Sequence, residues 1–107
     1  MPSMMQAGDY SATLHYLKGV HALGPERAKA SGRAVVDAMK AIPTEDPLFG
    51  SGSVRVDGRK LNPSYLFQIN SPEESKYPWD YHKLIRTIPA DQAFRPLTEG
   101  GCNLVKT

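Results

Sequence analysis

Residues 35–61, VVDAMKAIPTEDPLFGSGSVRVDGRKL, pass from a helical pattern to a strand pattern within one short stretch. Their first part carries an apolar face at helical spacing, formed by Val35, Val36, Met39 and Ile42. The next part, residues 44–53, is rich in Gly, Pro and Ser and therefore predicts a loop, with a flexible GSGS segment at 50–53. Residues 52–61 then alternate apolar and polar side chains up to Asp57-Gly58, which supplies the positive φ of a hairpin turn. This order predicts an α+β fold.

Two helices are predicted on the N-terminal side of the hairpin, over residues 9–23 and 26–41. Asp9 or Ser11 is expected to cap the first helix, and Gly24-Pro25 is expected to end it. Its predicted core-facing stripe consists of Tyr10, Leu14, Leu17 and His21. A carboxylate at position 17 is therefore expected to abolish folding, because it would be buried without a partner. The short connection predicts that the two helices are antiparallel or form a tight corner.

One further strand is predicted after the hairpin, over residues 64–70, with Tyr65, Phe67 and Ile69 on one face and Leu66 on the other. The stretch at 76–96, KYPWDYHKLIRTIPADQAFRP, leaves helix and strand equally open. Apolar residues in it recur at helical spacing, but its flanking prolines and β-branched residues favour a strand. The tail, residues 95–107, is predicted to be irregular.

Length and composition are those of one small globular domain, residues 1–107. The net charge of +2 comes from interspersed acidic and basic residues, which argues against a nucleic-acid partner. No apolar run is long enough for a membrane span. The N-terminus shows neither the basic nor the apolar region of a secretory signal, so no signal peptide is expected. The single cysteine, Cys102, cannot form an intramolecular disulfide and is expected to be inert.

Residue types that carry catalysis or bind metals do not assemble into a recognisable motif. The histidines at 15, 21 and 82 lack ligands at metal spacing and are expected at the surface or its boundary. The carboxylates in loop-like surroundings are expected to be solvated; they are Glu73, Glu74, Asp80 and Asp91. The segment 50–53 lacks the strand, helix and Lys-Ser/Thr that a phosphate loop requires. The sequence therefore predicts no catalytic residue, no metal site and no cofactor, and argues against an enzyme.

Four blocks of sequence carry a resemblance to a known family: residues 6–20, 35–61, 65–69 and 75–97. In their order and spacing they resemble the last third of periplasmic substrate-binding proteins of the branched-chain amino acid and amide class of ABC transporters. The family places a small or apolar residue where this chain has Asp9, a charge that a helix start tolerates. The resemblance implies a fragment of an α/β fold of two lobes, with two N-terminal helices, a hairpin and one further strand. It also implies that residues 79–88 form a late strand.

What the resemblance implies about function is a periplasmic protein without catalytic activity. Such proteins hold an amino acid, an amide or a related small acid between two lobes and deliver it to an ABC permease. The loop before the first helix borders the cleft, so Met5 and Gln6 are the predicted ligand-binding residues. Because the chain resembles only the last third, we expect a truncated or separately encoded fragment without a complete cleft. The alternative is an interaction module that forms a homodimer through exposed strand edges and apolar faces.

Overall fold

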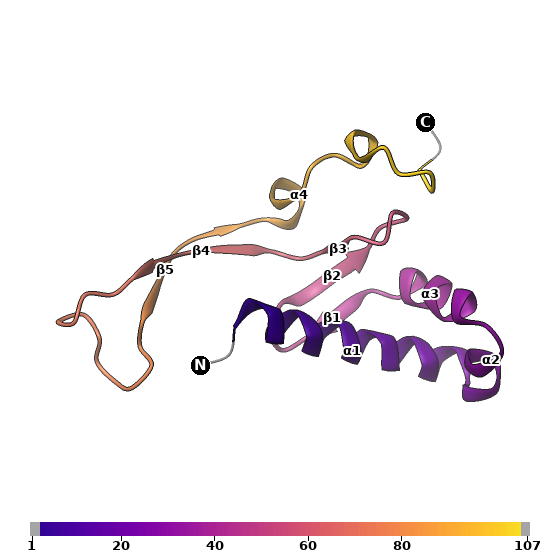
Figure 1. Cartoon of the computed structure of the whole chain (residues 1–107), viewed down its shortest axis with the longest axis horizontal. Helices are drawn as coiled ribbons and strands as arrows, with labels where there is room; N and C mark the ends of the chain where they lie inside the picture. The colour runs from indigo at the N-terminus through magenta and orange to yellow at the C-terminus, as the bar shows by residue number, and fades with distance from the viewer. Residues whose placement is uncertain (1–2, 106–107) are drawn as a thin grey trace.

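The computed structural model describes residues 3–105, which form an α+β structure with a layered body and a projecting ribbon (Figure 1). The helices are α1 (Met4–Leu23), α2 (Pro25–Ala30), α3 (Gly32–Ala41), α4 (Ala90–Ala93) and the 3₁₀ helix η1 (Leu97–Gly100). The strands are β1 (Thr44–Asp46), β2 (Gly50–Val54), β3 (Lys60–Leu61), β4 (Ser64–Ile69) and β5 (His82–Ile88). The predicted α+β class is confirmed, with more strands than the hairpin and single strand that we expected.

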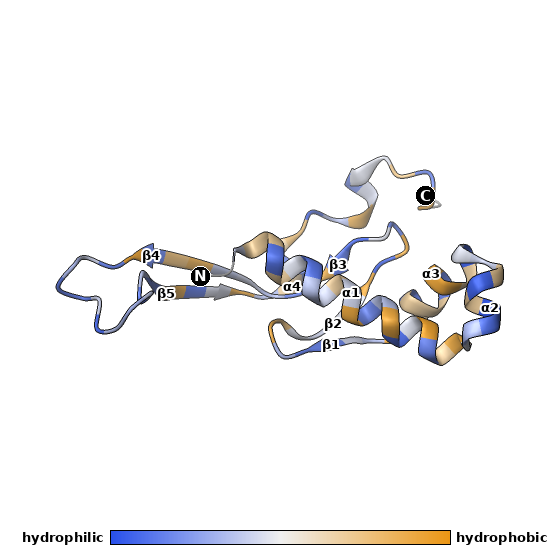
Figure 2. Ribbon diagram, turned by 60° about the horizontal axis from the view of Figure 1, so that its bottom comes forward, coloured by the Kyte–Doolittle hydropathy of each residue, from blue (hydrophilic) through white to orange (hydrophobic). Residues whose placement is uncertain are grey.

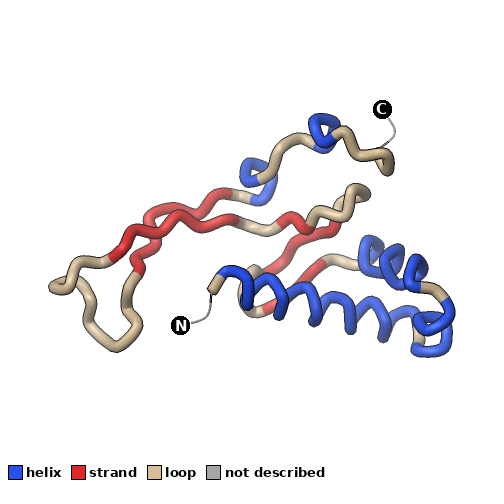
Figure 3. The backbone as a smooth tube through the Cα atoms, in the orientation of Figure 1, coloured by secondary structure: helices blue, strands red, loops and turns tan. Residues whose placement is uncertain are grey.

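The strands form two separate antiparallel sheets, drawn in red in Figure 3. One has the order β1-β2-β3 and packs against α1 and α3, which makes the layered body. The other is the two-stranded β4–β5 ribbon, which extends away from the body (Figure 1). The Cα radius of gyration is 17.2 Å. A compact chain of this length would have a value of about 13 Å, so the molecule is elongated.

Helix α1 begins earlier than the sequence predicts, because Ser3 rather than Asp9 or Ser11 is its cap. The Ser3 hydroxyl accepts a hydrogen bond from the Gln6 backbone N–H, and the Gln6 side chain accepts one from the Ser3 backbone N–H. This capping box satisfies two of the donors that a helix start leaves unpaired. The predicted end is confirmed: Gly24 adopts φ 88°, and its N–H donates to the Val20 carbonyl.

The helix predicted over residues 26–41 is divided into α2 and α3 at Ser31. Ser31 has an extended backbone, and its hydroxyl accepts a hydrogen bond from the Ala34 N–H at 3.2 Å, so it caps α3. The next residue is Gly32, which favours a helix less than alanine by about 1 kcal/mol. A good cap beside a poor helix former explains the break. Helix α3 then returns along α1, in agreement with the predicted antiparallel or cornered pair (Figure 1).

The predicted buried stripe of α1 is wrong. The buried face consists of Ser11, His15 and Gly19, whereas Leu17 is 56% exposed. Helix α3 comes so close that a Cβ added at Gly19 would lie 2.8 Å from Met39 Cγ. The His15 Nε2 atom is 2.8 Å from the Met39 carbonyl oxygen. Small and hydrogen-bonding residues therefore occupy the contact, and the larger apolar side chains point outward. His15 is buried rather than at the surface, while His21 and His82 are exposed as predicted.

Residues 44–53 were predicted as a loop, and this prediction is wrong because they supply β1 and β2. Thr44 pairs with Gly52, and Ser53 pairs with Leu61, so Gly52 lies in the central strand. A Cβ at Gly52 would lie 2.7 Å from Thr44 Oγ1 and still closer to the Leu61 carbonyl oxygen. Gly52, one of the glycines that predicted flexibility, is therefore required by the close approach of the neighbouring strands. The turn at Asp57-Gly58 is confirmed, with Gly58 at φ 84°.

The ambiguous stretch forms strand β5 because β4 lies beside it. Pairing runs from Ser64↔Ile88 to Ile69↔His82, with an irregularity at Leu66/Phe67 that leaves Ile85 without a partner. The strand that the resemblance implied is therefore present, although it begins at His82 rather than Trp79. The tail from Arg95, predicted to be irregular, contains the short 3₁₀ helix η1, and α4 lies just before it.

Candidate functional site

Met5 and Gln6, the predicted ligand-binding residues, lie in the first turn of α1. Met5 is 69% exposed and Gln6 is also exposed. This end of the helix lies on the side of the body from which the ribbon extends (Figure 1). The Gln6 carbonyl oxygen is held by the capping box, while no described residue contacts its amide nitrogen through a hydrogen bond. That nitrogen is available to a ligand.

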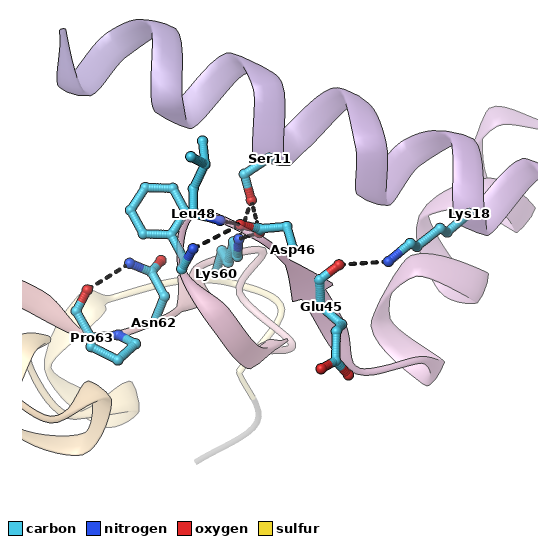
Figure 4. Close-up of polar contacts among 9 residues, drawn as sticks. Ser11, Lys18, Glu45, Asp46, Leu48, Lys60, Asn62 and Pro63 are labelled. Carbon is cyan, nitrogen blue, oxygen red and sulfur yellow. Dashed lines mark hydrogen bonds and ion pairs between the residues drawn. The ribbon is translucent and has the colours of Figure 1, made fainter. Parts of the chain in front are cut away.

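A buried polar cluster of Ser11, Asp46 and Lys60 joins α1 to the sheet (Figure 4). Ser11 Oγ donates to Asp46 Oδ2 at 2.5 Å, and Lys60 Nζ contacts the same carboxylate oxygen at 2.9 Å. Lys60 Nζ also donates to the Ser11 hydroxyl. The other carboxylate oxygen, Oδ1, accepts hydrogen bonds from the backbone N–H groups of Leu48 and Phe49. Three separate segments of the chain thus meet at one carboxylate.

The electrostatics of Asp46 favour its charged form. Burial by itself raises the pKa of this carboxyl, and only 3% of its side chain is exposed. The hydrogen bonds from Ser11, Lys60 and the two backbone N–H groups outweigh burial and hold the pKa of Asp46 well below its usual range. Because its oxygens are already occupied, Asp46 has little capacity left for a substrate proton or a metal ion. The cluster is a structural joint rather than a reactive site.

The joint fixes the position of the helix end that carries Met5 and Gln6. Ser11 lies in the turn after those residues, and farther along α1 the Lys18 Nζ donates to the Glu45 carbonyl at 2.5 Å. Both contacts end on β1, so α1 is held to the sheet at two points (Figure 4). A helix held at two points cannot rotate about its own axis without breaking one of them. The start of α1 is therefore a rigid edge of the body.

The ribbon presents an apolar surface that nothing among residues 3–105 covers. The register places Tyr65, Phe67, Ile69, His82 and Leu84 on one side, which we call the aromatic face. Ile69 is 75% exposed, and Phe67 packs against Tyr65 and His82 with ring centroids 6.3 and 6.1 Å apart. The other side is mixed and carries Leu66, Gln68, Lys83 and Arg86. Figure 2 shows both polar and apolar colours on each of the two strands.

A structured loop closes the far end of the ribbon. Asn70 Nδ2 donates to the Asp80 carbonyl at 3.0 Å, and the Asp80 carboxylate accepts from the Lys76 N–H at 3.0 Å. Trp79 has φ 74°, which is uncommon for a residue other than glycine, and it is 63% exposed. The aromatic rings of this loop lie on the surface, with Trp79 edge-on to Tyr81 and the ring centroids 6.0 Å apart.

The remaining candidate residues do not converge on a site. Glu74 pairs with Lys83, and Glu73 and Asp91 are exposed. Cys102 is half-buried beside the hairpin turn. Within the part of the chain that the structure describes, no three His, Cys, Asp or Glu side chains are grouped as a metal site would require. Over residues 3–105 no helix has both the length and the apolarity that crossing a membrane requires.

Sequence reasoning missed the joint at Asp46, although one local signal was present. Asp46 precedes Pro47, and an Asp at such a position commonly accepts hydrogen bonds from the backbone two or three residues later. The partners Ser11 and Lys60 are 35 and 14 residues away in sequence. No periodicity or spacing in a single sequence connects them.

Comparisons with known proteins agree with this architecture. A family model described as periplasmic binding protein matches residues 1–76. The crystal structure of a periplasmic binding protein from Burkholderia mallei has a TM-score of 0.85 and 39% sequence identity over 99% of this chain. A branched-chain amino acid ABC transporter periplasmic ligand-binding protein from Burkholderia xenovorans has a TM-score of 0.83 and 38% identity over 97% of this chain.

This chain spans only 27% of the length of each of those two structures. No curated protein matches it. The likeness nevertheless extends over nearly the whole chain, and it includes the β4–β5 ribbon as well as the layered body. The chain belongs to the periplasmic binding protein family.

Proposed function

We propose that this chain supplies one part of a periplasmic solute-binding protein that passes amino acids, amides or related small acids to an ABC permease. The observation that carries the proposal is the 39% identity over 99% of the chain to a periplasmic binding protein. A second relative, 38% identical, is described as a branched-chain amino acid ABC transporter component, which supports the class of solute. The proposal assigns the chain no catalytic step. By itself the chain holds no complete ligand cleft.

Within this proposal, Met5 and Gln6 contact the solute. Both are exposed at the start of α1, and the Asp46 joint fixes that helix to the sheet. Gln6 offers an amide N–H group to a carboxylate or carbonyl of the solute, and Met5 offers an adaptable apolar surface. A rigid helix edge with one free donor suits an amino acid or amide, which has an anionic or carbonyl end and an apolar remainder.

The test is a chimaera in which this chain replaces the corresponding quarter of the Burkholderia xenovorans relative. Leucine, isoleucine and valine are titrated by calorimetry against the relative, the chimaera and the isolated chain. We expect the chimaera to bind a solute that the relative binds and the isolated chain to show no binding at micromolar concentrations. Micromolar binding by the isolated chain would contradict the absence of a complete cleft.

Variants of the chimaera test the two proposed contacts. Gln6→Ala is expected to weaken binding at least about tenfold, the effect of losing one hydrogen bond to a charged group. Ser3→Ala is the matched control, because it breaks the same capping box and leaves the Gln6 amide in place. Equal losses in the two variants would show that only the helix cap matters, and would remove Gln6 from the site.

A second candidate function is self-association, favoured by the amount of exposed surface. The solvent-accessible area is 8047 Å², whereas a compact monomer of this mass would expose about 5,900 Å². The excess is larger than the roughly 800 Å² per partner of a standard interface. The outer edge of β4 is the suitable contact, because SYLFQI carries no charge. The β5 edge carries Lys83, Arg86 and the unpartnered Ile85, features that oppose edge pairing.

Pairing of β4 with β4 of a second copy is two-fold symmetric and therefore stops at a dimer. Light scattering behind a sizing column at several concentrations is expected to give twice 11.8 kDa at the upper end. Leu66→Lys is expected to abolish the dimer, and Ile85→Lys on the other strand is its control, because both residues are 52% exposed. A mass near 11.8 kDa at every concentration would rule out this function.

A further inference from the structure

The hairpin turn after β2 and the C-terminal segment after α4 line an open surface hollow that the proposed function does not use. Its lining includes Gly58 and Arg59 from the turn, and Arg95, Gly100 and Cys102 from the segment. The two walls are joined by Arg55, whose Nη1 donates to the Arg95 carbonyl at 3.0 Å. Figure 1 shows the C-terminal segment passing over the end of the hairpin.

The single carboxylate in this lining, Asp57, is already saturated. Its Oδ2 accepts from Arg55 Nη2 at 2.5 Å, and its Oδ1 accepts from Arg55 Nε and from the Arg59 backbone N–H, both at 3.1 Å. Arg55 therefore lowers the pKa of Asp57 and keeps this carboxylate charged. Lys60, which also lines the hollow, is held by the Asp46 joint. No carboxylate in the lining is therefore left to neutralise Arg59 and Arg95.

The two guanidinium groups in this lining, Arg59 and Arg95, form no ion pair with any described residue. The guanidinium carbon of Arg59 lies 5.7 Å from the centre of the Phe94 ring, a cation–π contact, and no described residue accepts a hydrogen bond from the Arg59 side chain. Arg95 Nη2 lies 3.9 Å from the position that a Cβ at Gly100 would take. The guanidinium group of Arg95 therefore lies beside the Gly100 backbone. Two cations from opposite walls thus line one hollow.

We propose that Arg59 and Arg95 form a binding site for a small oxyanion, such as a carboxylate or a phosphate group. The planar, forked donor groups of arginine match the oxygen pairs of both anions. An anion between them would neutralise two unpaired charges and tie the hairpin turn to the C-terminal segment. Cys102 lies in the same lining, so its accessibility reports whether the hollow is occupied.

The experiment uses Cys102, the only cysteine, as the reporter. The rate of its alkylation is measured with iodoacetate, an anion, and with neutral iodoacetamide, and the ratio is compared with that for N-acetylcysteine. We expect the ratio to be several-fold higher in the protein, because the site attracts the anionic reagent. Millimolar inorganic phosphate or malonate is expected to slow both reactions, and sodium chloride at the same ionic strength is not. If only phosphate or only malonate protects Cys102, that anion is the one the site prefers.

Variants separate a site from a general charge effect. Arg59→Gln and Arg95→Gln are each expected to remove most of the protection, and Arg59→Lys, which keeps the charge but not the fork, to keep part of it. Arg27→Gln and Arg86→Gln remove the same charge at exposed positions outside the hollow. In these two variants the anions are expected to protect Cys102 as well as they do in the parent. Protection no greater than that by chloride, or equal losses in all four glutamine variants, would overturn the proposal. The alkylation assay uses the isolated chain and reads out Cys102, which lies outside the proposed cleft, so its result is independent of the chimaera experiment.

Discussion

The layered body and the β4–β5 ribbon are held together in different ways. In the body, the fully buried positions are mostly polar: Ser11, His15, Thr44 and Asp46, beside a single buried aliphatic residue, Val35. In the ribbon, large apolar residues such as Phe67 and Ile69 are exposed. The body is held by specific hydrogen bonds between segments distant in sequence, whereas the ribbon is held by its own backbone pairing and turn.

This difference indicates that the body depends on its internal hydrogen bonds, whereas the ribbon would gain stability if another surface buried its apolar face. Buried polar groups are costly unless each has a partner, so the body needs all of its contacts at once. An isolated two-stranded ribbon is marginal in water and gains stability when one face is buried. Substitutions in the body should therefore alter folding, and substitutions on the ribbon should alter association.

The largest effect is expected from Asp46→Ala in the body. Removing one partner of a buried ion pair leaves Lys60 and Ser11 unpaired, and because Lys60 is 22% exposed we expect a loss of about 3 kcal/mol in unfolding free energy. Urea unfolding followed by circular dichroism measures the loss. Lys83→Ala is the ribbon counterpart, since its pair with Glu74 is largely exposed, and its unfolding midpoint should stay that of the parent.

The Asp46 contribution should also depend on pH. Its pKa is lower in the folded chain than in the unfolded one, so the unfolded state binds more protons as the pH falls. The stabilisation is complete above the pKa of an unfolded aspartate, about 3.9, and is lost progressively below it. The difference between the parent and Asp46→Ala should accordingly shrink as the pH is lowered below about 4. A difference that stays constant down to pH 2 would show that Asp46 is not stabilised as its charged form.

A substitution at Gly52 should come next, because a side chain there has no space between β1 and β3. Gly52→Val is expected to cost about 3 kcal/mol, since its Cβ meets the Leu61 carbonyl, which cannot move to another rotamer. Gly8→Ala is the control, because its Cβ meets nothing within 4 Å and lies inside α1. The control should gain up to about 1 kcal/mol from helix propensity. Equal midpoints for the two variants would show that the small sheet is not formed.

Gly58→Val should have a smaller effect, limited to the hairpin turn. Nothing lies within 4 Å of an added Cβ, so the cost is the backbone strain of a β-branched residue at φ 84°. We expect a loss of roughly 1–2 kcal/mol in unfolding free energy. Gly58→Asn, which tolerates this conformation better, should lose less. If Gly58→Val and the parent had the same thermal midpoint, the turn at Asp57-Gly58 would not be formed in the folded protein.

The smallest effect is expected from Leu17→Asp. The sequence pattern predicted that this change would abolish folding, but the exposed position of Leu17 predicts a change within about 0.5 kcal/mol. Thermal melting of the variant decides between the two. A collapse of the fold would show that the outer stripe of α1 is buried in solution, for example by a second copy, and the stripe would then resemble the ribbon rather than the body.

Local chemistry was sufficient to predict several elements. Gly24-Pro25 ended α1, Asp57-Gly58 formed the hairpin turn, and the alternation in SYLFQI gave β4. The family resemblance also supplied the late strand, which periodicity had left undecided. Each of these features depends on backbone conformations or side-chain periods within a few residues. A single sequence records such preferences directly.

Tertiary structure alone decided which surfaces are buried and how the body is joined. The close approach of α3 buried Ser11, His15 and Gly19 in place of the apolar stripe, and strand pairing turned the Gly-rich segment at 50–53 into β2. Asp46 contacts Ser11 and Lys60, which are distant from it in sequence. The C-terminal segment places Arg95 in the same hollow as Arg59. These outcomes depend on distances between segments that are remote in sequence. Neither propensity nor periodicity contains those distances, because both describe only neighbours along the chain.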